Sequence, residues 1–89
     1  MFEYDPGMAI DQVPLREQAY SLGPAQYGQP VHQPDEALAV SAWIQTRTGH
    51  HLVEGVAVAW TPKAARIRYT DDHGREGYAW VWASAVVRR

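Results

Sequence analysis

The stretch RIRYTDDHGREGYAWVW, residues Arg66–Trp82, holds two runs of alternating side chains on either side of a glycine-containing turn. Period-two alternation that includes Tyr, Trp and Val is typical of β-strands. The intervening Asp72-His73-Gly74 suits a three-residue hairpin loop in which the glycine adopts the left-handed conformation. The stretch therefore predicts a β-hairpin, with strands at about 65–70 and 75–82.

The length of this loop decides which side chains share a face of the hairpin. In a three-residue loop Asp71 pairs with Arg75, and this register continues along both strands. One face then carries Ile67, Tyr69, Ala79 and Val81, and the other carries Arg66, Arg68, Tyr78, Trp80 and Trp82. Because a core cannot easily hold two arginines, we predict that the second face is outside, with guanidinium groups over aromatic rings.

A loop one residue shorter or longer gives the opposite result. Trp80 and Trp82 then join Ile67 and Tyr69 in the core, and the arginines face water. A domain of this size also needs large side chains inside, so we expect at least one of the two tryptophans to be mainly core. The turn thus decides whether the aromatic residues are core or binding surface.

The same alternation runs through the rest of the C-terminal part. Further strands are predicted at about 38–46, 53–61 and 86–89, with a loop at 47–52 and short turns at 62–64 and 83–85. The earlier strands would add Ala42, Ile44, Val56, Val58 and Trp60 to the core. Five short strands joined by tight turns predict an all-β fold, a small closed barrel over residues 37–89.

Residues 1–36 differ in composition, because they contain five of the six prolines and five of the six glutamines. Such a composition predicts an extended, weakly ordered arm. Pro14 suits the first position of a helix and Gly23 suits the position after its end, so at most one short helix is predicted in the arm, between these two residues. A helix this short is not stable alone and would have to dock on the barrel or on a partner.

Charge and cysteine content exclude several classes of function. Residues 1–36 carry six acidic residues against one basic residue, whereas residues 37–89 carry four against seven. The lack of cysteine removes disulfides, cysteine-ligated zinc and thiol catalysis, and it favours a cytoplasmic location. The N-terminus does not resemble a signal peptide, and no apolar run is long enough to span a membrane, so we expect no membrane association.

The candidate catalytic and metal-binding residues have simpler structural interpretations. His50 and His51 are adjacent, and neighbouring side chains on a strand point apart; only a loop would let them share a metal, with His73 or His32 as a third ligand. The Asp71-Asp72 pair precedes a turn, where Asp commonly bonds the local backbone. No nucleophile with a base partner and no phosphate-binding loop is evident, so we expect no enzyme, no metal and no cofactor.

The segment RIRYTDDHGREGYAWVWASAVV, residues 66–87, resembles the SH3-like small barrels, including the Tudor and KOW types. This resemblance implies a five-stranded barrel. TRTGHHLVEGVAVAW at 46–60 and AWVWASAVV at 79–87 are more loosely similar to the type II dihydrofolate reductases, which join an N-terminal arm to an SH3-like barrel. In that family a glutamine lines a tetramer pore, and Trp80 stands at the matching position here. The second resemblance therefore implies self-association rather than reductase activity.

The exposed face predicted above determines the expected function. Trp, Tyr and Arg are the residue types that dominate the binding energy of protein interfaces. We expect an interaction or assembly module that binds a protein partner or itself through Arg66, Arg68, Tyr78, Trp80 and Trp82, with Trp43 nearby. The alternative is a nucleic-acid-binding barrel that uses the same residues for base stacking and phosphate contacts. The acidic arm offsets the basic barrel, which favours a protein partner over nucleic acid.

Overall fold

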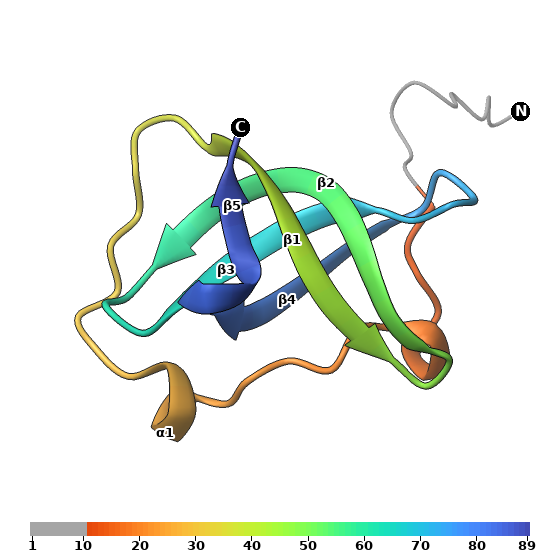
Figure 1. Ribbon diagram of the computed structural model, residues 1–89, viewed down its shortest axis with the longest axis horizontal. Coiled ribbons are helices and arrows are strands. Elements are labelled where there is room, and N and C mark those ends of the chain that lie inside the picture. The colour runs from red at the N-terminus through yellow and green to blue at the C-terminus, as the bar shows by residue number, and fades with distance from the viewer. Residues whose placement is uncertain (1–10) are drawn as a thin grey trace, which may run out of the picture.

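The computed structural model describes residues 11–89 and confirms the all-β class (Figure 1). Five antiparallel strands form one sheet with the order β4-β3-β2-β1-β5. They are β1 (Leu38–Thr46), β2 (Gly49–Trp60), β3 (Ala64–Thr70), β4 (Glu76–Trp82) and β5 (Val86–Arg88). The helical elements of the described part are short: two 3-10 turns, η1 (Leu15–Glu17) and η2 (Ala83–Ala85), and the single-turn helix α1 (Pro24–Tyr27).

The β3–β4 hairpin has the three-residue loop. Asp71 and Arg75 face each other, with the Asp71 amide donating to the Arg75 carbonyl at 2.8 Å, and Gly74 has a φ of 75°. The register that follows pairs Arg68 with Tyr78 and Arg66 with Trp80. The prediction that the arginines and the three aromatic residues share one face is therefore confirmed.

The β1–β2 hairpin corrects two expectations. The loop predicted at 47–52 is a tight turn, because β2 already begins at Gly49 and pairs with Thr46. Before the register shift between Ala57 and Ala59, Ala57 pairs with the buried Ile67 and Val56 pairs with the exposed Arg68, so Ala57 faces inward and Val56 faces outward. Ala57 lies in the core, whereas Val56 and Val58 are only half-buried, so the prediction for these two valines is wrong.

The core lies on the concave side of the sheet and is made mostly of small side chains. Ile67 is fully buried, and Tyr69, Ala79 and Val81 from the same hairpin lie beside it, as predicted. The strand β1 contributes Val40, Ala42 and Ile44, and Trp60 packs against the cluster from β2. The described residues thus form a core in which alanine is frequent and tryptophan lies at the edge.

The sheet is not closed, which corrects the expectation of a closed barrel; its shape remains compatible with a small barrel-like fold. In the chain before β1, residues 11–32 dock on the sheet and are called the arm below. The arm runs along the open side of the sheet, where Val13 and Ala19 are buried within the core cluster. The edge strand β4 therefore meets the arm instead of another strand. The first ten residues of the predicted N-terminal arm lie outside the described residues.

The helix predicted between Pro14 and Gly23 is not present as an α-helix. Only η1 forms there, because the backbone is extended from Gln18 onward and its amides bond to the sheet. The Tyr20 amide donates to the Gln45 carbonyl at 2.7 Å, which would be impossible within a helix. The single α-helical turn, α1, begins at Pro24 instead. Among the residues that the structure describes, no helix has the length and apolar character needed to cross a membrane.

Candidate functional site

The outer face of β3 and β4 carries five of the six predicted site residues, which we call the Arg/aromatic face: Arg66, Arg68, Tyr78, Trp80 and Trp82. The guanidinium of Arg66 lies over the ring of Tyr78, 4.5 Å from its centroid. Arg68 is 3.8 Å from Glu76, a half-exposed ion pair. Tyr78 and Trp82 are 37% and 45% exposed. The face is therefore a row of aromatic rings beside two cations.

Neither Trp80 nor Trp82 belongs to the core, so the expectation that at least one of them is mainly core is wrong. Both point to the outer side because they share it with Arg66 and Arg68 in the three-residue-loop register. Alanines of the sheet and two arm residues, Val13 and Ala19, fill the interior in their place. Trp80 is half-buried for another reason, which is that the arm covers it.

The contact between the arm and Trp80 combines an aromatic stack with hydrogen bonds to the edge of β4. The ring of Tyr27 lies parallel to the indole, with centroids 3.9 Å apart and an interplanar angle of 10°. The Leu22 amide donates to the Trp80 carbonyl at 3.0 Å, and the Trp80 amide donates to the Ser21 hydroxyl at 2.8 Å. The backbone and the ring of Trp80 thus both bind the arm.

A second pair of backbone bonds holds the arm to the same edge strand. The Val13 amide donates to the Glu76 carbonyl at 3.0 Å, and the Glu76 amide donates to the Asp11 carbonyl at 2.8 Å. Glu76 and Trp80 lie four residues apart on β4, so their backbone groups point to the same side of the strand. The arm therefore satisfies the outer edge of β4 at two places, as an added strand would.

The end of the arm is anchored on β2. The buried Thr61 hydroxyl donates to the Tyr27 carbonyl at 2.5 Å, which fixes α1 against the β2–β3 turn. His32 and Trp60 exchange two backbone hydrogen bonds of 2.7 and 2.9 Å, and their rings lie 4.9 Å apart. Both contacts position Tyr27 over Trp80 from the C-terminal side of the arm.

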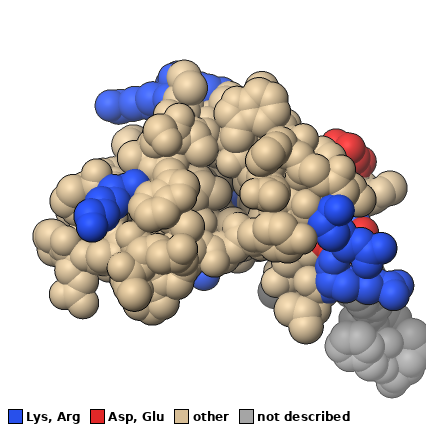
Figure 2. Space-filling model, turned by 60° about the horizontal axis from the view of Figure 1, so that its bottom comes forward, with Lys and Arg blue, Asp and Glu red and all other residues tan. Residues whose placement is uncertain are grey.

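Figure 2 shows the side of the molecule on which the arm lies. Uncharged residues form most of this surface, and the Lys and Arg side chains are at its margins. A hollow of about 500 Å³ separates the arm from the sheet here. Its lining comes from both sides: Ser21, Tyr27, Val31, Gln33, Ala59, Arg66, Tyr78, Ala79 and Trp80.

Trp43 lies elsewhere on the sheet. It is 52% exposed and pairs across strands with Leu52, which is also exposed. Its strand, β1, is separated from β4 by β2 and β3 in the sheet order. The structure therefore brings five of the predicted site residues together and places the sixth on a different part of the surface.

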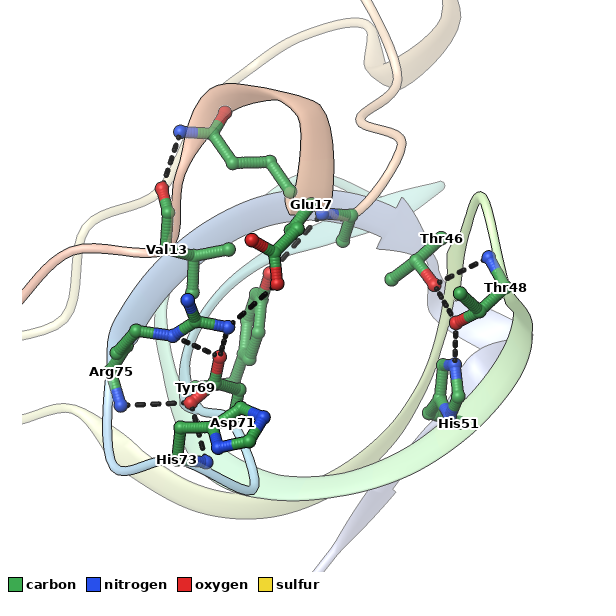
Figure 3. Close-up of polar contacts among 11 residues, drawn as sticks. Val13, Glu17, Thr46, Thr48, His51, Tyr69, Asp71, His73 and Arg75 are labelled. Atoms are coloured by element: carbon green, nitrogen blue, oxygen red, sulfur yellow. Dashed lines mark hydrogen bonds and ion pairs between the residues drawn. The ribbon is translucent and has the colours of Figure 1, made fainter.

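A cluster of charged residues, Glu17, Asp71 and Arg75, ties the arm to the β3–β4 turn (Figure 3). Arg75 Nη2 is 2.9 Å from Glu17 Oε1 and 2.7 Å from Asp71 Oδ2, and its Nε donates to the same Asp71 oxygen at 2.8 Å. Asp71 Oδ1 accepts the backbone amides of His73 and Arg75. Asp71 thus performs the turn-forming role predicted for it, and Arg75 connects that turn to η1.

These contacts favour the charged forms of all three side chains. The hydrogen bond from Arg75, with smaller help from nearby positive charges, lowers the pKa of Glu17 below its ordinary value. For Asp71 desolvation opposes ionisation, but the hydrogen bonds from Arg75 and His73 outweigh it and lower the pKa. The same two acids raise the pKa of Arg75, with the Glu17 bond as the largest cause.

An open groove of about 740 Å³ lies beside this cluster, between η1 and the two hairpin turns. Its lining includes His50, His51 and His73. The first two lie on β2 opposite Gln45 and Ile44, so their side chains point to opposite faces of the strand. Among residues 11–89, no group of three or more His, Cys, Asp or Glu side chains is arranged to hold a metal ion.

Sequence reasoning missed the arm residues that contact the Arg/aromatic face, namely Ser21, Leu22 and Tyr27. Tyr27 and Trp80 are far apart in sequence, and no local pattern links them. The one available signal was composition, because YSLGPAQYGQP at 20–30 combines two tyrosines with the turn-forming residues Gly and Pro.

Comparison of the chain with protein-family models, with curated proteins and with solved structures finds no match in any of the three.

Proposed function

We propose that this protein is a non-enzymatic interaction module with an SH3-like small barrel, which binds an extended segment of a protein partner or of a second copy through its Arg/aromatic face. One observation carries the proposal: the face already binds a segment of the same chain, which bonds to the edge of β4 and then forms the helical turn α1 that carries Tyr27. The arm bonds to the edge of β4 through Ser21 and Leu22, and it stacks Tyr27 on Trp80.

This contact has the two components of a common mode of peptide recognition. Backbone hydrogen bonds to an exposed sheet edge provide affinity, and a side chain that fits a surface feature provides specificity. Here the edge is β4, and the surface feature is the indole of Trp80 beside the hollow that Arg66 and Tyr78 line. Stacked aromatic pairs contribute about 0.5–1.5 kcal/mol beyond the area that they bury.

The part of the face that the arm leaves open supports binding in trans as well. Tyr78 and Trp82 are exposed large aromatic residues, and Arg66 and Arg68 lie in the adjoining strand. Such residues supply most of the binding energy when an interface covers them. A partner segment that continues past Trp80 would meet Trp82 next along β4.

The ion-pair cluster supports a structural role better than catalysis. Proton transfer is efficient when the pKa of the catalytic group lies near the working pH. The contacts of Glu17, Asp71 and Arg75 move each pKa away from neutrality, toward the permanently charged form. We therefore propose no enzymatic activity for this cluster, and we retain the cytoplasm as the proposed compartment because the chain lacks cysteine.

Nucleic acid is the second candidate ligand, supported by the cation over the ring of Tyr78 and by the exposed indole of Trp82. Single strands bind by stacking bases on such rings while arginines hold phosphates. The Arg68–Glu76 contact weakens this reading, because it offsets one of the two cations on the face. Salt separates the candidates, since affinity for nucleic acid falls steeply between about 50 and 200 mM salt.

A labelled peptide with the sequence of residues 20–30 tests the proposal. It is titrated by fluorescence anisotropy into the full chain carrying Tyr27→Ala, in which the stack on Trp80 is removed. We expect saturable binding that changes little with salt, and weaker binding of a control peptide whose Tyr27 is Ala. Equal responses to both peptides, or tighter salt-sensitive binding of a mixed-sequence single-stranded DNA, would contradict it.

A further inference from the structure

The arm contributes to the core and also bonds to the edge of the sheet. Val13 and Ala19 are buried in the core cluster, and the Ala19 amide donates to the Tyr69 hydroxyl at 3.2 Å. The sheet therefore needs an arm on its open side. Nothing in these contacts requires the arm to come from the same chain.

The connection between the arm and β1 is held far less firmly. His32 is bonded to Trp60, and Leu38 is paired with Ala57, which fixes the two ends. Between them lie residues 33–37, QPDEA, of which all but Pro34 are exposed. None of these five residues forms a hydrogen bond or an ion pair with another residue of the part of the chain that the structure describes. The connection can change direction without the loss of a described polar contact.

Charge favours docking between chains in the same way as docking within one. The arm contains Glu17, which pairs with Arg75 of the turn, and the remaining sheet region has an excess of basic residues. If the arm of one chain docked on the sheet of another, every contact would form unchanged, from the backbone hydrogen bonds to Glu76 to the stack of Tyr27 on Trp80. Exchange of an identical element between protomers is a low-cost route to a dimer, because only the hinge adopts a new conformation.

We infer that the arm exchanges between two copies of this chain, so that residues 11–32 of each copy dock on the sheet of the other in a reciprocal dimer. The partner of the Arg/aromatic face is then a second copy, and the inference rests on the proposed function of that face. The hinge is the segment 33–37. The dimer is favoured when the protein concentration approaches the effective concentration that a short linker gives, which is in the millimolar range.

Mixed isotope labelling tests this inference directly on the full chain. Labelled and unlabelled protein are unfolded together, refolded at about 1 mM and studied by isotope-filtered NOE spectroscopy. At this concentration, docking of the arm on a second copy competes with docking on its own sheet. We expect contacts between the Tyr27 ring of one copy and the Trp80 ring of the other, together with a doubled mass in light scattering. Monomeric protein in which these contacts are only intramolecular would overturn arm exchange.

A hinge variant sharpens the result. Deletion of Asp35 and Glu36 shortens the connection so that the arm reaches its own sheet with difficulty, whereas D35G/E36G keeps its length and serves as the matched control. The deletion should lower the dissociation constant of the dimer by on the order of tenfold or more relative to this control. Equal constants for the two variants would contradict the assigned hinge, and the wild-type labelling result stands even if the deletion variant does not fold.

The two proposals fail in different ways. If the peptide of residues 20–30 binds in trans while the full chain stays monomeric at about 1 mM, arm exchange is wrong and the peptide-binding function stands. If the peptide does not bind, the proposed function itself is wrong.

Discussion

Tyr27 and Trp80 form a parallel stack with 3.9 Å between ring centroids, although 53 residues separate them in the sequence. The stack joins the arm to the Arg/aromatic face, and it explains why Trp80 is half-buried while Trp82 remains exposed. The stacked ring of Tyr27 is carried by the last residue of the helical turn α1.

Tyr27→Ala should expose Trp80 and lower the free energy of unfolding by about 0.5–1.5 kcal/mol, the usual contribution of an aromatic pair. Acrylamide quenching of tryptophan fluorescence measures the exposure, and urea unfolding measures the stability. Tyr20→Ala is the control, because Tyr20 is 58% exposed and its hydrogen bond to Gln45 is made by its backbone amide, not by its side chain. Equal quenching in both variants would show that Tyr27 does not cover Trp80.

Gly77→Ala should destabilise the fold by about 1–3 kcal/mol, as overpacking of a core does. A Cβ at Gly77 would lie 2.6 Å from the hydroxyl and Cζ of Tyr69, so the ring would have to move. That movement would also break the bond from the Ala19 amide to Tyr69. Urea unfolding checks this, with Gly23→Ala as the control, since a Cβ there meets only the Gln26 side chain at 3.9 Å. Equal midpoints for the two variants would be incompatible with this packing.

Acid should weaken the attachment of the arm through Glu17 and Asp71. The pKa of each carboxyl is lowered in the folded protein, so each contributes stability above its ordinary pKa, and that contribution is lost as the pH falls through the lowered value. Stability should therefore decline as the pH drops below about 4.5, the ordinary value for Glu. Arg75→Gln should flatten this part of the pH profile of urea unfolding, whereas Arg66→Gln should not. A profile that is unchanged by Arg75→Gln would show that the cluster does not couple to folding.

Trp80→Ala should weaken binding of the peptide of residues 20–30 in the Tyr27→Ala background, whereas Trp43→Ala should leave it unchanged. Trp80 carries the indole on which Tyr27 stacks, and Trp43 lies across two intervening strands. Truncation of a residue that dominates an interface costs about 2 kcal/mol or more. Fluorescence anisotropy compares the two variants, and a larger loss for Trp43→Ala would move the binding surface to β1 and β2.

The sequence allowed the hairpin to be predicted in detail because local chemistry specifies its turn. Asp71 bonds the backbone of the loop, and Gly74 supplies the left-handed conformation at no steric cost, so one register follows for both strands. The same register determined which aromatic residues are exposed. The phase of β2 has no comparable local signal: Ala57 faces inward opposite Ile67 and Val56 faces outward opposite Arg68, whereas the period-two pattern alone predicted the opposite phase for this part of the strand.

The sequence predicted that the segment after Pro14 would dock on the barrel or on a partner, but the place of docking could not be predicted, because it depends on contacts between distant parts of the chain. Backbone hydrogen bonds join Leu22 to Trp80 and His32 to Trp60, and no sequence pattern links the residues of either pair. The arm also explains why the tryptophans need not fill the core, since its own Val13 and Ala19 do so. An expectation based on the sheet alone therefore overestimated how much aromatic surface must be buried.

The most direct test of the central claim compares the affinity of the peptide of residues 20–30 for the wild-type chain, for Tyr27→Ala and for the double variant Tyr27→Ala, Trp80→Ala. If the arm occupies the face that an external segment uses, Tyr27→Ala binds the peptide more tightly than wild type, and removal of Trp80 abolishes the gain. The same affinity for all three proteins would contradict the claim that the Arg/aromatic face is a binding site for extended segments.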